Sequence, residues 1–244
     1  MLINDNLKDK ANNGDTFNMP NLYIVATPIG NLEDITYRAV RILKEADFVL
    51  CEDTRVTSKL LARYEIGTPT ISYHQHSDGN KVKYILDLLS QGKNLALVTD
   101  AGTPGISDPG GQLVAEALKS IDGAKIISIP GPSALAAAAS ISGISIDKFV
   151  FMGFPPVKKK RKKFFEEVIR SKYPVIFYES SHRIMKSLNE LKEIIGNSGE
   201  APCQVIVCRE LTKKFETVYR GAIAEVLKKL ENDKIKGEFV VIVG

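Results

Sequence analysis

The fold of this chain is decided by one stretch, Leu95-Ala-Leu-Val-Thr-Asp-Ala-Gly-Thr-Pro-Gly-Ile-Ser-Asp-Pro-Gly-Gly111. Its first four residues are apolar and predict a buried strand, and apolar residues from Leu113 to Leu118 predict a helix. Between them lies a loop rich in glycine, proline and aspartate. Because such connections usually take about 2–6 residues, the longer loop favours a ligand site over a plain connection. A strand, a glycine-rich loop and a helix form the ligand-binding edge of many α/β proteins.

The rest of the first half repeats this order of strand and helix. Each apolar run is followed by a segment with helical spacing, for example Thr36 to Ala46. Five such units predict a doubly wound α/β domain with a mostly parallel sheet over residues 21–143. The strands are expected at residues 22–26, 48–51, 70–73, 95–98 and 125–129. The polar residues 1–20 are predicted to be a disordered N-terminal extension.

The second half keeps the α/β class, but its connections differ. Short connections near residues 213–221 suit antiparallel neighbours, so a mixed sheet is predicted. We place the domain boundary in the Ser- and Gly-rich segment after Ser140 and assign residues 144–244 to a C-terminal α/β domain. Its strands are expected at residues 149–152, 175–178, 205–208, 217–220 and 239–243, and its helices at 161–172, 184–195 and 223–230.

The composition indicates a globular protein outside the membrane. The chain has 244 residues, of which 44% are hydrophobic and 25% charged, as is usual for soluble domains. No window of about 20 residues is apolar enough to span a bilayer, so no membrane partner is expected. The polar N-terminus lacks the apolar core of a secretory signal. Three cysteines without metal-ligand spacing, Cys51, Cys203 and Cys208, predict reduced thiols and a cytoplasmic location.

The positive charge of the chain is concentrated in one place. The net charge is only +4, but six cations stand in a row: Lys158, Lys159, Lys160, Arg161, Lys162 and Lys163. Such a run is typical either of a solvated helix start or of a surface that docks a polyanion. Because Trp is absent and aromatic residues make up 7% of the chain, the composition gives little sign of a base-stacking platform.

Chemically active side chains gather where the strands of the first half end. If the sheet is parallel, they meet at one edge, where open α/β sheets bind ligands. Sequence motifs for a phosphate-binding loop, a nucleophile elbow and a dinucleotide-binding turn are absent. His74 and His76 without a third ligand are weak signs of a metal, and none is expected. The side chains at this edge are Glu52, Asp53, Arg55, His74, His76, Asp100 and Asp108.

Seven motifs along the chain resemble one known family. Together they are similar to the bacterial 16S ribosomal RNA methyltransferases that modify a cytidine ribose 2′-hydroxyl, within the tetrapyrrole methylase superfamily. The resemblance extends from about Asn21 to Gly244 and covers nearly everything beyond the polar extension. The motifs are Val25-Ala-Thr-Pro-Ile-Gly-Asn-Leu-Glu-Asp-Ile-Thr36, Glu52-Asp-Thr-Arg55, Thr99-Asp-Ala-Gly-Thr-Pro-Gly-Ile-Ser-Asp-Pro-Gly110, Pro130-Gly-Pro-Ser-Ala134, Phe177-Tyr-Glu-Ser-Ser-His-Arg183, Arg209-Glu-Leu-Thr-Lys213 and Gly237-Glu-Phe239.

The resemblance implies a methyl donor and a place for it. It implies that S-adenosylmethionine binds in a cleft between the two domains, that the protein is a homodimer, and that the substrate is 16S rRNA within the small ribosomal subunit. Glycine, proline and small polar residues suit the close backbone contact that this cofactor needs. The residues implied to bind it are Pro28, Ile29, Gly30, Thr103, Pro104, Ile106, Ser133, Ala134, Tyr178, Ser180, Glu238 and Phe239.

Methyl transfer to a hydroxyl needs positioning and a route for the hydroxyl proton. Candidates for the proton acceptor are Asp100, Asp53 and His74 or His76, and we favour Asp100 because it opens the long loop. Asp100 is equally well interpreted as a cap for backbone N–H groups of that loop. The cationic run at residues 158–163 is expected to dock RNA. Three further candidates for phosphate binding also have acidic neighbours as alternative partners: Arg55, Arg183 and Arg209.

Two other functions compete with this interpretation. One is a small-molecule methyltransferase of the same superfamily that acts on a tetrapyrrole carbon. The cationic run and the motifs at residues 52–55 and 178–183 argue against it. The other is a non-catalytic RNA-binding assembly factor that has kept the fold. Binding of S-adenosylmethionine would separate this factor from an enzyme.

Overall fold

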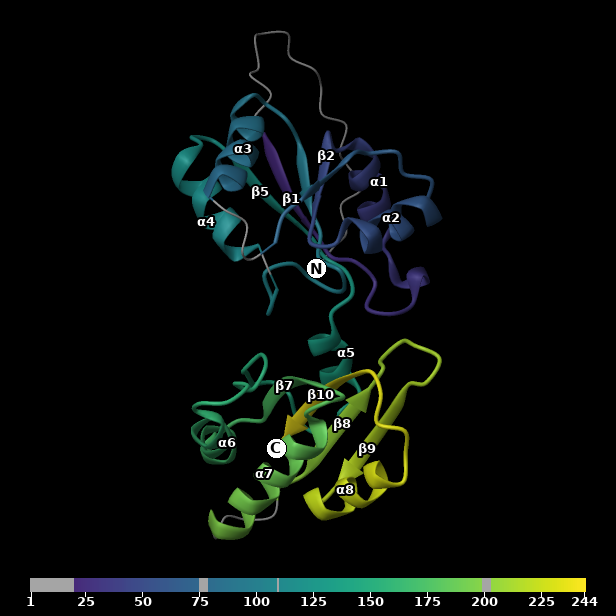
Figure 1. Ribbon diagram of the computed structural model, residues 1–244, viewed down its shortest axis with the longest axis vertical. Helices are drawn as coiled ribbons and strands as arrows, with labels where there is room; N and C mark the ends of the chain where they lie inside the picture. The colour runs from purple at the N-terminus through teal and green to yellow at the C-terminus, as the bar shows by residue number, and fades with distance from the viewer. Residues whose placement is uncertain (1–19, 75–78, 109, 199–202) are drawn as a thin grey trace.

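The computed structural model describes residues 20–74, 79–108, 110–198 and 203–244. These residues form two lobes, each built on a five-stranded sheet, and the lobes are stacked along the long axis of the molecule (Figure 1). The extension predicted for residues 1–20 lies, except for Pro20, outside the described part of the chain, and so does His76. No helix among the described residues is long and apolar enough to cross a membrane.

The first sheet is entirely parallel, with the strand order β3-β2-β4-β1-β5. This order confirms the predicted doubly wound sheet. Since all the strands run in one direction, the loops that follow them leave the sheet at the same edge, and this edge faces the second lobe (Figure 1). The strands are β1 (Asn21–Val25), β2 (Phe48–Cys51), β3 (Thr70–Ser72), β4 (Leu95–Leu97) and β5 (Lys125–Ile129).

Helices cover both faces of the first sheet. Alternate strand residues such as Val49 and Leu50 point to opposite faces, and each face has its own apolar core. The helices α1 and α2 pack on the face of Val49, and α3 and α4 on the face of Leu50. Thr36 caps α1 because its hydroxyl accepts from the backbone N–H of Ala39 at 3.0 Å. The elements are η1 (Leu32–Asp34), α1 (Tyr37–Glu45), α2 (Thr54–Arg63), α3 (Gly79–Ser90) and α4 (Gly111–Ser120).

The second sheet is mixed, as predicted, with the order β6-β7-β10-β8-β9. Only β6 and β7 are parallel, and the other neighbours are antiparallel. The helices α6, α7 and α8 share one apolar core on one face of this sheet. The elements are α5 (Ala134–Ser140), β6 (Val150–Phe151), α6 (Arg161–Arg170), β7 (Val175–Ser180), α7 (Ile184–Ser198), β8 (Val205–Arg209), β9 (Thr217–Gly221), α8 (Ile223–Glu231) and β10 (Glu238–Val243).

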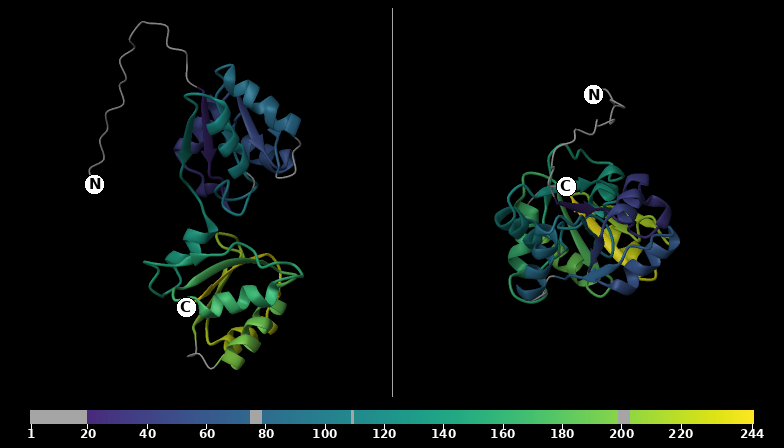
Figure 2. Two further views of the ribbon diagram at one scale, coloured as in Figure 1. Left: turned by 90° about the vertical axis from the view of Figure 1, so that its left-hand side faces the viewer. Right: turned by 90° about the horizontal axis from the view of Figure 1, so that it is seen from above.

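The helix α5 covers the other face of the second sheet. Its residue Ala138 is fully buried and shares a core with Ile176, Ile206 and Ile242 of that sheet. The chain crosses from the first lobe to the second where it enters α5 (Figure 2). The packing of α5 therefore favours a boundary before α5 instead of after residue 143. We propose residues 21–133 and 134–244 as the two structural units.

Candidate functional site

A pocket of about 430 Å³ lies where the strand ends of the first lobe meet the second sheet, a volume within the range usual for small-molecule sites. Its walls come from the loops after β1, β2 and β4, from the start of α5, and from β7, β8 and β10 with their adjoining loops. The lining residues are Ile29, Glu52, Thr99, Asp100, Ala101, Gly102, Thr103, Ile106, Ser107, Asp108, Ser133, Ala134, Phe154, Tyr178, Glu179, Ser180, Cys208, Glu210, Leu211, Lys213, Gly237, Glu238, Phe239 and Val240.

The long loop after β4 is held in place by its neighbours. Thr27 and Gly102 exchange two backbone hydrogen bonds, of 2.9 and 3.0 Å, and the Thr27 hydroxyl donates to the Thr99 carbonyl at 3.0 Å. The Thr103 hydroxyl donates to the carbonyl of Pro132, which precedes α5, at 3.2 Å. Three loops that are distant in sequence thus form one fixed wall of the pocket, as the site interpretation of this loop requires.

Gly110 shows how closely this loop is packed. Its φ is 141°, and a Cβ there would lie 3.0 Å from Leu97 Cδ2 and 3.3 Å from the Gly105 nitrogen. We therefore expect Gly110→Ala to lower the free energy of unfolding by about 1–3 kcal/mol, as measured by urea unfolding. Gly111→Ala is the matched control, because no atom lies within 4 Å of a Cβ at Gly111. Equal stabilities of the two variants would contradict this account of the loop.

The structure brings most of the predicted cofactor residues to the pocket. Three do not line it: Pro28, Gly30 and Pro104. Gly30 has a different role, because a Cβ there would lie 2.3 Å from Lys213 Cγ. Its lack of a side chain lets Lys213 of the second lobe cross over the loop that follows β1. The predicted cofactor residues in the wall are Ile29, Thr103, Ile106, Ser133, Ala134, Tyr178, Ser180, Glu238 and Phe239.

The pocket is strongly acidic. Lys213, the one lysine among the described residues that line the pocket, donates to Glu210 at 2.9 Å and to Glu238 at 2.7 Å. These bonds and charges outweigh the opposing effect of burial and raise the pKa of the Lys213 ammonium. It therefore stays charged, and an excess of negative charge suits a cationic ligand. The carboxylates of the wall are Glu52, Asp100, Asp108, Glu179, Glu210 and Glu238.

Among the carboxyl groups of the pocket, Asp108 has the most strongly shifted pKa. Partial desolvation and the nearby charges of Glu52, Asp100 and Glu238 raise its pKa from 3.8 to about 6, although a hydrogen bond with Thr99 opposes the shift. One side of Asp108 stays exposed to solvent. A carboxyl group that titrates near neutral pH at a pocket wall is suited to accept and release a proton. The sequence does not single out Asp108 as a proton acceptor, although this residue lies in the glycine-rich loop.

The four candidates for the proton acceptor have different surroundings. Asp53 lies outside the pocket wall and caps α2, where its hydrogen bonds with the Arg55 side chain and backbone lower its pKa to about 2. A group with so low a pKa is a weak base. Asp100 lines the pocket, and its Oδ1 accepts from the Asp53 backbone N–H at 3.2 Å. Asp100 therefore links the ends of β4 and β2, because the N–H from which it accepts belongs to the loop after β2 and not to its own loop. His74 does not line the pocket, and His76 is outside the described residues.

The predicted RNA-binding residues divide into exposed and internal groups. The Arg55 side chain is 87% exposed and pairs with Asp53 at 2.6 Å. Arg161 is buried and donates to Glu190, Pro156 and Ser187. Arg209 is buried and pairs with Asp233 at 3.0 Å, and Arg183 pairs with Glu179 at 2.9 Å. Direct RNA contact is not supported for the last three arginines. The exposed lysines of the run are Lys158, Lys159, Lys160, Lys162 and Lys163.

Among the residues that the structure describes, no group of three or more His, Cys, Asp or Glu side chains is arranged to hold a metal ion. The three cysteines are not linked by disulfides. Cys208 is buried at the pocket wall, and burial raises the pKa of its thiol to about 11. A buried thiol of raised pKa is a poor nucleophile. The reactive groups that the pocket offers are therefore its carboxyl groups.

The sequence from residue 21 to 227 matches the family model of tetrapyrrole (corrin/porphyrin) methylases. The chain belongs to this family. Three curated relatives have the name ribosomal RNA small subunit methyltransferase I. The relative from Halalkalibacterium halodurans is 47% identical over 91% of this chain and 75% of its own length. The relative from Thermotoga maritima is 41% identical over 92% of this chain and 98% of its own length. The relative from Bacillus subtilis is 44% identical over 91% of this chain and 74% of its own length.

Solved tetrapyrrole methylase structures share the two-lobed fold. A cobalt precorrin-4 methyltransferase of cobalamin biosynthesis superposes with a TM-score of 0.66 at 21% identity, covering 93% of this chain and 95% of that one. The uroporphyrin III C-methyl transferase of Thermus thermophilus superposes with a TM-score of 0.62 at 17% identity, covering 92% of this chain and 97% of that one. At these identities the likeness shows the fold alone. The predicted class of two α/β units, one parallel and one mixed, is confirmed.

Proposed function

We propose that this tetrapyrrole methylase transfers a methyl group from S-adenosylmethionine to the ribose 2′-hydroxyl of a cytidine in 16S rRNA of the small ribosomal subunit. The observation that carries the proposal is an acidic pocket whose lining residue Phe154 stands four residues before a run of exposed lysines, in a chain 41–47% identical to relatives named for small-subunit rRNA methylation. The lysines suit a polyanion, and the carboxylates suit a cationic methyl donor.

The residues of the pocket fit S-adenosylmethionine. The excess of carboxylates complements a sulfonium and an ammonium group. The apolar side chains of Ile29 and Ile106 supply a surface for a flat ring. Gly102, with a φ of 88°, lies in a fixed part of the wall where backbone groups are close to the cavity. These features support the choice of cofactor.

The bound cofactor supplies an electrophilic methyl group on sulfur. The remaining work is to orient the ribose hydroxyl in line with that group and to take up its proton. We propose that the Asp108 carboxylate accepts this proton, since it lines the pocket and is open to solvent on one side. Solvent on this side then receives the proton when Asp108 is regenerated. Asp100 holds the ends of β4 and β2 together and so keeps this wall in position.

A methylation assay tests the proposed reaction against its alternatives. Purified small ribosomal subunits and uroporphyrinogen are each incubated with the protein and labelled S-adenosylmethionine. Label in a 2′-O-methylcytidine nucleoside of the 16S rRNA is the expected result. Label in the porphyrinogen alone would favour a tetrapyrrole substrate. Absence of cofactor binding at millimolar concentration in calorimetry would favour a non-catalytic assembly factor.

Thr103→Arg tests the position of the cofactor. Thr103 lines the pocket and its hydroxyl donates to the Pro132 carbonyl, so a long charged side chain there fills the cavity. We expect the Kd for S-adenosylmethionine to rise by more than about tenfold, measured by calorimetry. Arg at the exposed Leu118 of α4 is the control, because this side chain does not line the pocket. Unchanged affinity of the Thr103 variant would remove this loop from the proposed site.

We propose two further properties on the strength of the family resemblance. The first is a homodimer, which sedimentation equilibrium of the purified protein tests directly. The second is a cytoplasmic location, which agrees with an rRNA substrate and with three cysteines that are not joined in disulfides. A monomer at micromolar concentration would contradict the first proposal, and fractionation with a membrane or an extracellular fraction would contradict the second.

A further inference from the structure

The cationic run is preceded by a loop whose first part is firmly held. We call residues 153–160 the basic loop. The Gly153 carbonyl accepts from the backbone N–H of Tyr178 in β7 at 2.8 Å. The next residue, Phe154, lines the pocket and packs edge-on against Tyr178 with ring centroids 5.4 Å apart. The loop therefore starts at the pocket wall, and its aromatic side chain, still 50% exposed, stands at the mouth.

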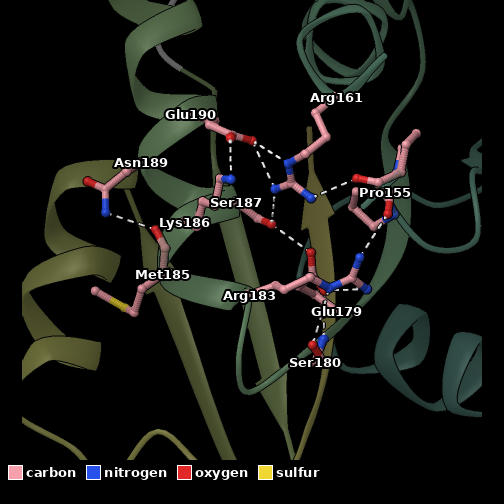
Figure 3. A network of polar contacts seen from close by, with 11 residues as sticks. Pro155, Arg161, Glu179, Ser180, Arg183, Met185, Lys186, Ser187, Asn189 and Glu190 are labelled. Atoms are coloured by element: carbon pink, nitrogen blue, oxygen red, sulfur yellow. Dashed lines mark hydrogen bonds and ion pairs between the residues drawn. The ribbon is translucent and has the colours of Figure 1, made fainter. Parts of the chain in front are cut away.

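Two arginines hold the middle of the basic loop. The Pro155 carbonyl accepts from Arg183 Nη1 at 3.1 Å (Figure 3). The Pro156 carbonyl accepts from Arg161 Nη1 at 2.9 Å. Proline has no N–H and a restricted φ, so these two carbonyls are the polar backbone groups by which this part of the loop can be held. The following four residues, Val157 to Lys160, are exposed.

Both arginines belong to one network that reaches the pocket. Arg161 Nη2 donates to the Ser187 hydroxyl at 2.9 Å, and this hydroxyl donates to Glu179 Oε2 at 2.6 Å. Glu179 Oε1 pairs with Arg183 at 2.9 Å. Glu190 completes the network by pairing with Arg161 at 2.9 Å (Figure 3). Glu179 is buried and lines the pocket. Buried charges that satisfy one another in this way fix their geometry.

We propose that Arg161 and Arg183 are positioning residues for the RNA substrate, because they hold the basic loop so that its lysines meet the RNA backbone beside the pocket. This inference rests on the proposed function. It replaces direct phosphate contact as the role of the two arginines. The occupant is an RNA backbone because Lys158, Lys159 and Lys160 are consecutive and exposed, and no pairing with a carboxylate is described for them. A preorganised loop loses less entropy when it binds than a mobile one.

Steady-state kinetics of Arg161→Met tests the inference. We expect the KM for small-subunit RNA to rise about tenfold, with kcat within about twofold and the Kd for S-adenosylmethionine unchanged. Arg161→Lys keeps the positive charge, but lysine has no planar guanidinium with which to bind the three acceptors at once. The KM of this variant should therefore lie between those of the Met variant and the unsubstituted protein. A purely structural loss would lower the number of cofactor sites per chain in calorimetry without raising KM.

Two further variants complete this experiment. Arg170→Met removes an exposed arginine from the same helix, far from the network, and should leave the KM unchanged. Ser187→Ala removes one acceptor of Arg161 with a smaller change in packing and should raise the KM about threefold. It provides the test if Arg161→Met does not fold. The inference is overturned if the folded variants at Arg161 and Ser187 keep the KM of the unsubstituted protein.

Fluorescence tests the loop independently of the reaction. The chain contains no tryptophan, so Val157→Trp, at the exposed residue that follows Pro156, places a single reporter in the basic loop. Arg161→Met in this background should lower the fluorescence anisotropy, because the loop becomes mobile, and Arg170→Met should not. Equal anisotropy in all three proteins would overturn the inference. If the unsubstituted protein does not methylate rRNA, the proposed function fails, while the fluorescence still reports whether the network holds the loop.

Discussion

Asp108→Asn is expected to lower kcat for RNA methylation by about 10²–10⁴-fold, the usual contribution of a positioned general base. Asparagine keeps the size of the side chain but cannot take a proton from the ribose hydroxyl. The cofactor wall is unchanged, so binding of S-adenosylmethionine should persist within a few-fold. The measurement is single-turnover methyl transfer to small ribosomal subunits. Asp122→Asn, in the exposed turn before β5, is the control for an Asp-to-Asn change away from the pocket.

The pH dependence gives this prediction a second test. The pKa of Asp108 is about 6, so the fraction of enzyme with a base at this position rises between pH 5 and 7. We expect the methylation rate to rise over the same interval and then to level off. Asp108→Asn should abolish this rise. An unchanged rate and pH profile in the variant would refute Asp108 as the proton acceptor.

Stability should depend on pH in the opposite direction. Because the folded pKa of Asp108 lies above its ordinary value of 3.8, the fold disfavours the charged form. Asp108 therefore lowers the stability progressively as the pH rises from about 4 through 6. Asp108→Asn should raise the Tm at pH 8, with little change below pH 4, as measured by thermal unfolding at both values. Higher stability with lower activity is typical of catalytic positions.

Reversing the charge of Lys158, Lys159 and Lys160 to glutamate is expected to weaken RNA binding roughly 10²-fold at low salt. These side chains are exposed at the end of the basic loop. Each lost phosphate contact reduces the slope of log affinity against log salt by about 0.7–0.9, so the variant should also show a flatter salt dependence. Filter binding of a 16S rRNA fragment over a salt series gives both quantities.

This experiment excludes Arg161 from the substitutions. A glutamate at position 161 would place a negative charge in the buried network and destabilise the fold. A loss of RNA binding could then reflect either unfolding or the lost positive charge. The control reverses three exposed lysines of the second lobe that do not line the pocket, Lys192, Lys228 and Lys229, and so changes the net charge equally. Cofactor affinity should be the same in both variants. Equal RNA affinity of the two variants would refute the docking role of the basic loop.

Most of the fold could be predicted because its signals are local. Most strands and helices can be recognised from the spacing of apolar residues within their own segment, without reference to tertiary contacts. The exception is α5, whose alanine-rich sequence has no polar face. Its assignment to one lobe or the other depends on Ala138 packing on Ile206 and Ile242, which is a tertiary contact. The composition of residues 140–147 carries no sign of this contact, so the sequence alone predicts a boundary after residue 143, whereas the packing of α5 favours one before residue 134.

The residue types of the site could be predicted, but their individual roles could not. Asp53, Asp100 and Asp108 all follow strand ends, and only their contacts distinguish a helix cap, a loop brace and a partly desolvated acid. For Arg161 the sequence did contain a signal. It precedes Phe164, Phe165 and Val168 at the spacing of the buried face of α6. A cation in that stripe indicates an internal partner and not a solvent-exposed contact.

The strand orders of the two sheets also determine how the protein reaches its folded state. In the first sheet, Tyr23 of the central strand pairs with both Ala96 and Ile127, so the chain must close very long loops before this sheet exists. In the second, Val205 pairs with Gly221 across a short connection. Local pairings form faster, so we expect the second lobe to gain amide protection first during refolding. The pocket, which needs both sheets, is completed last.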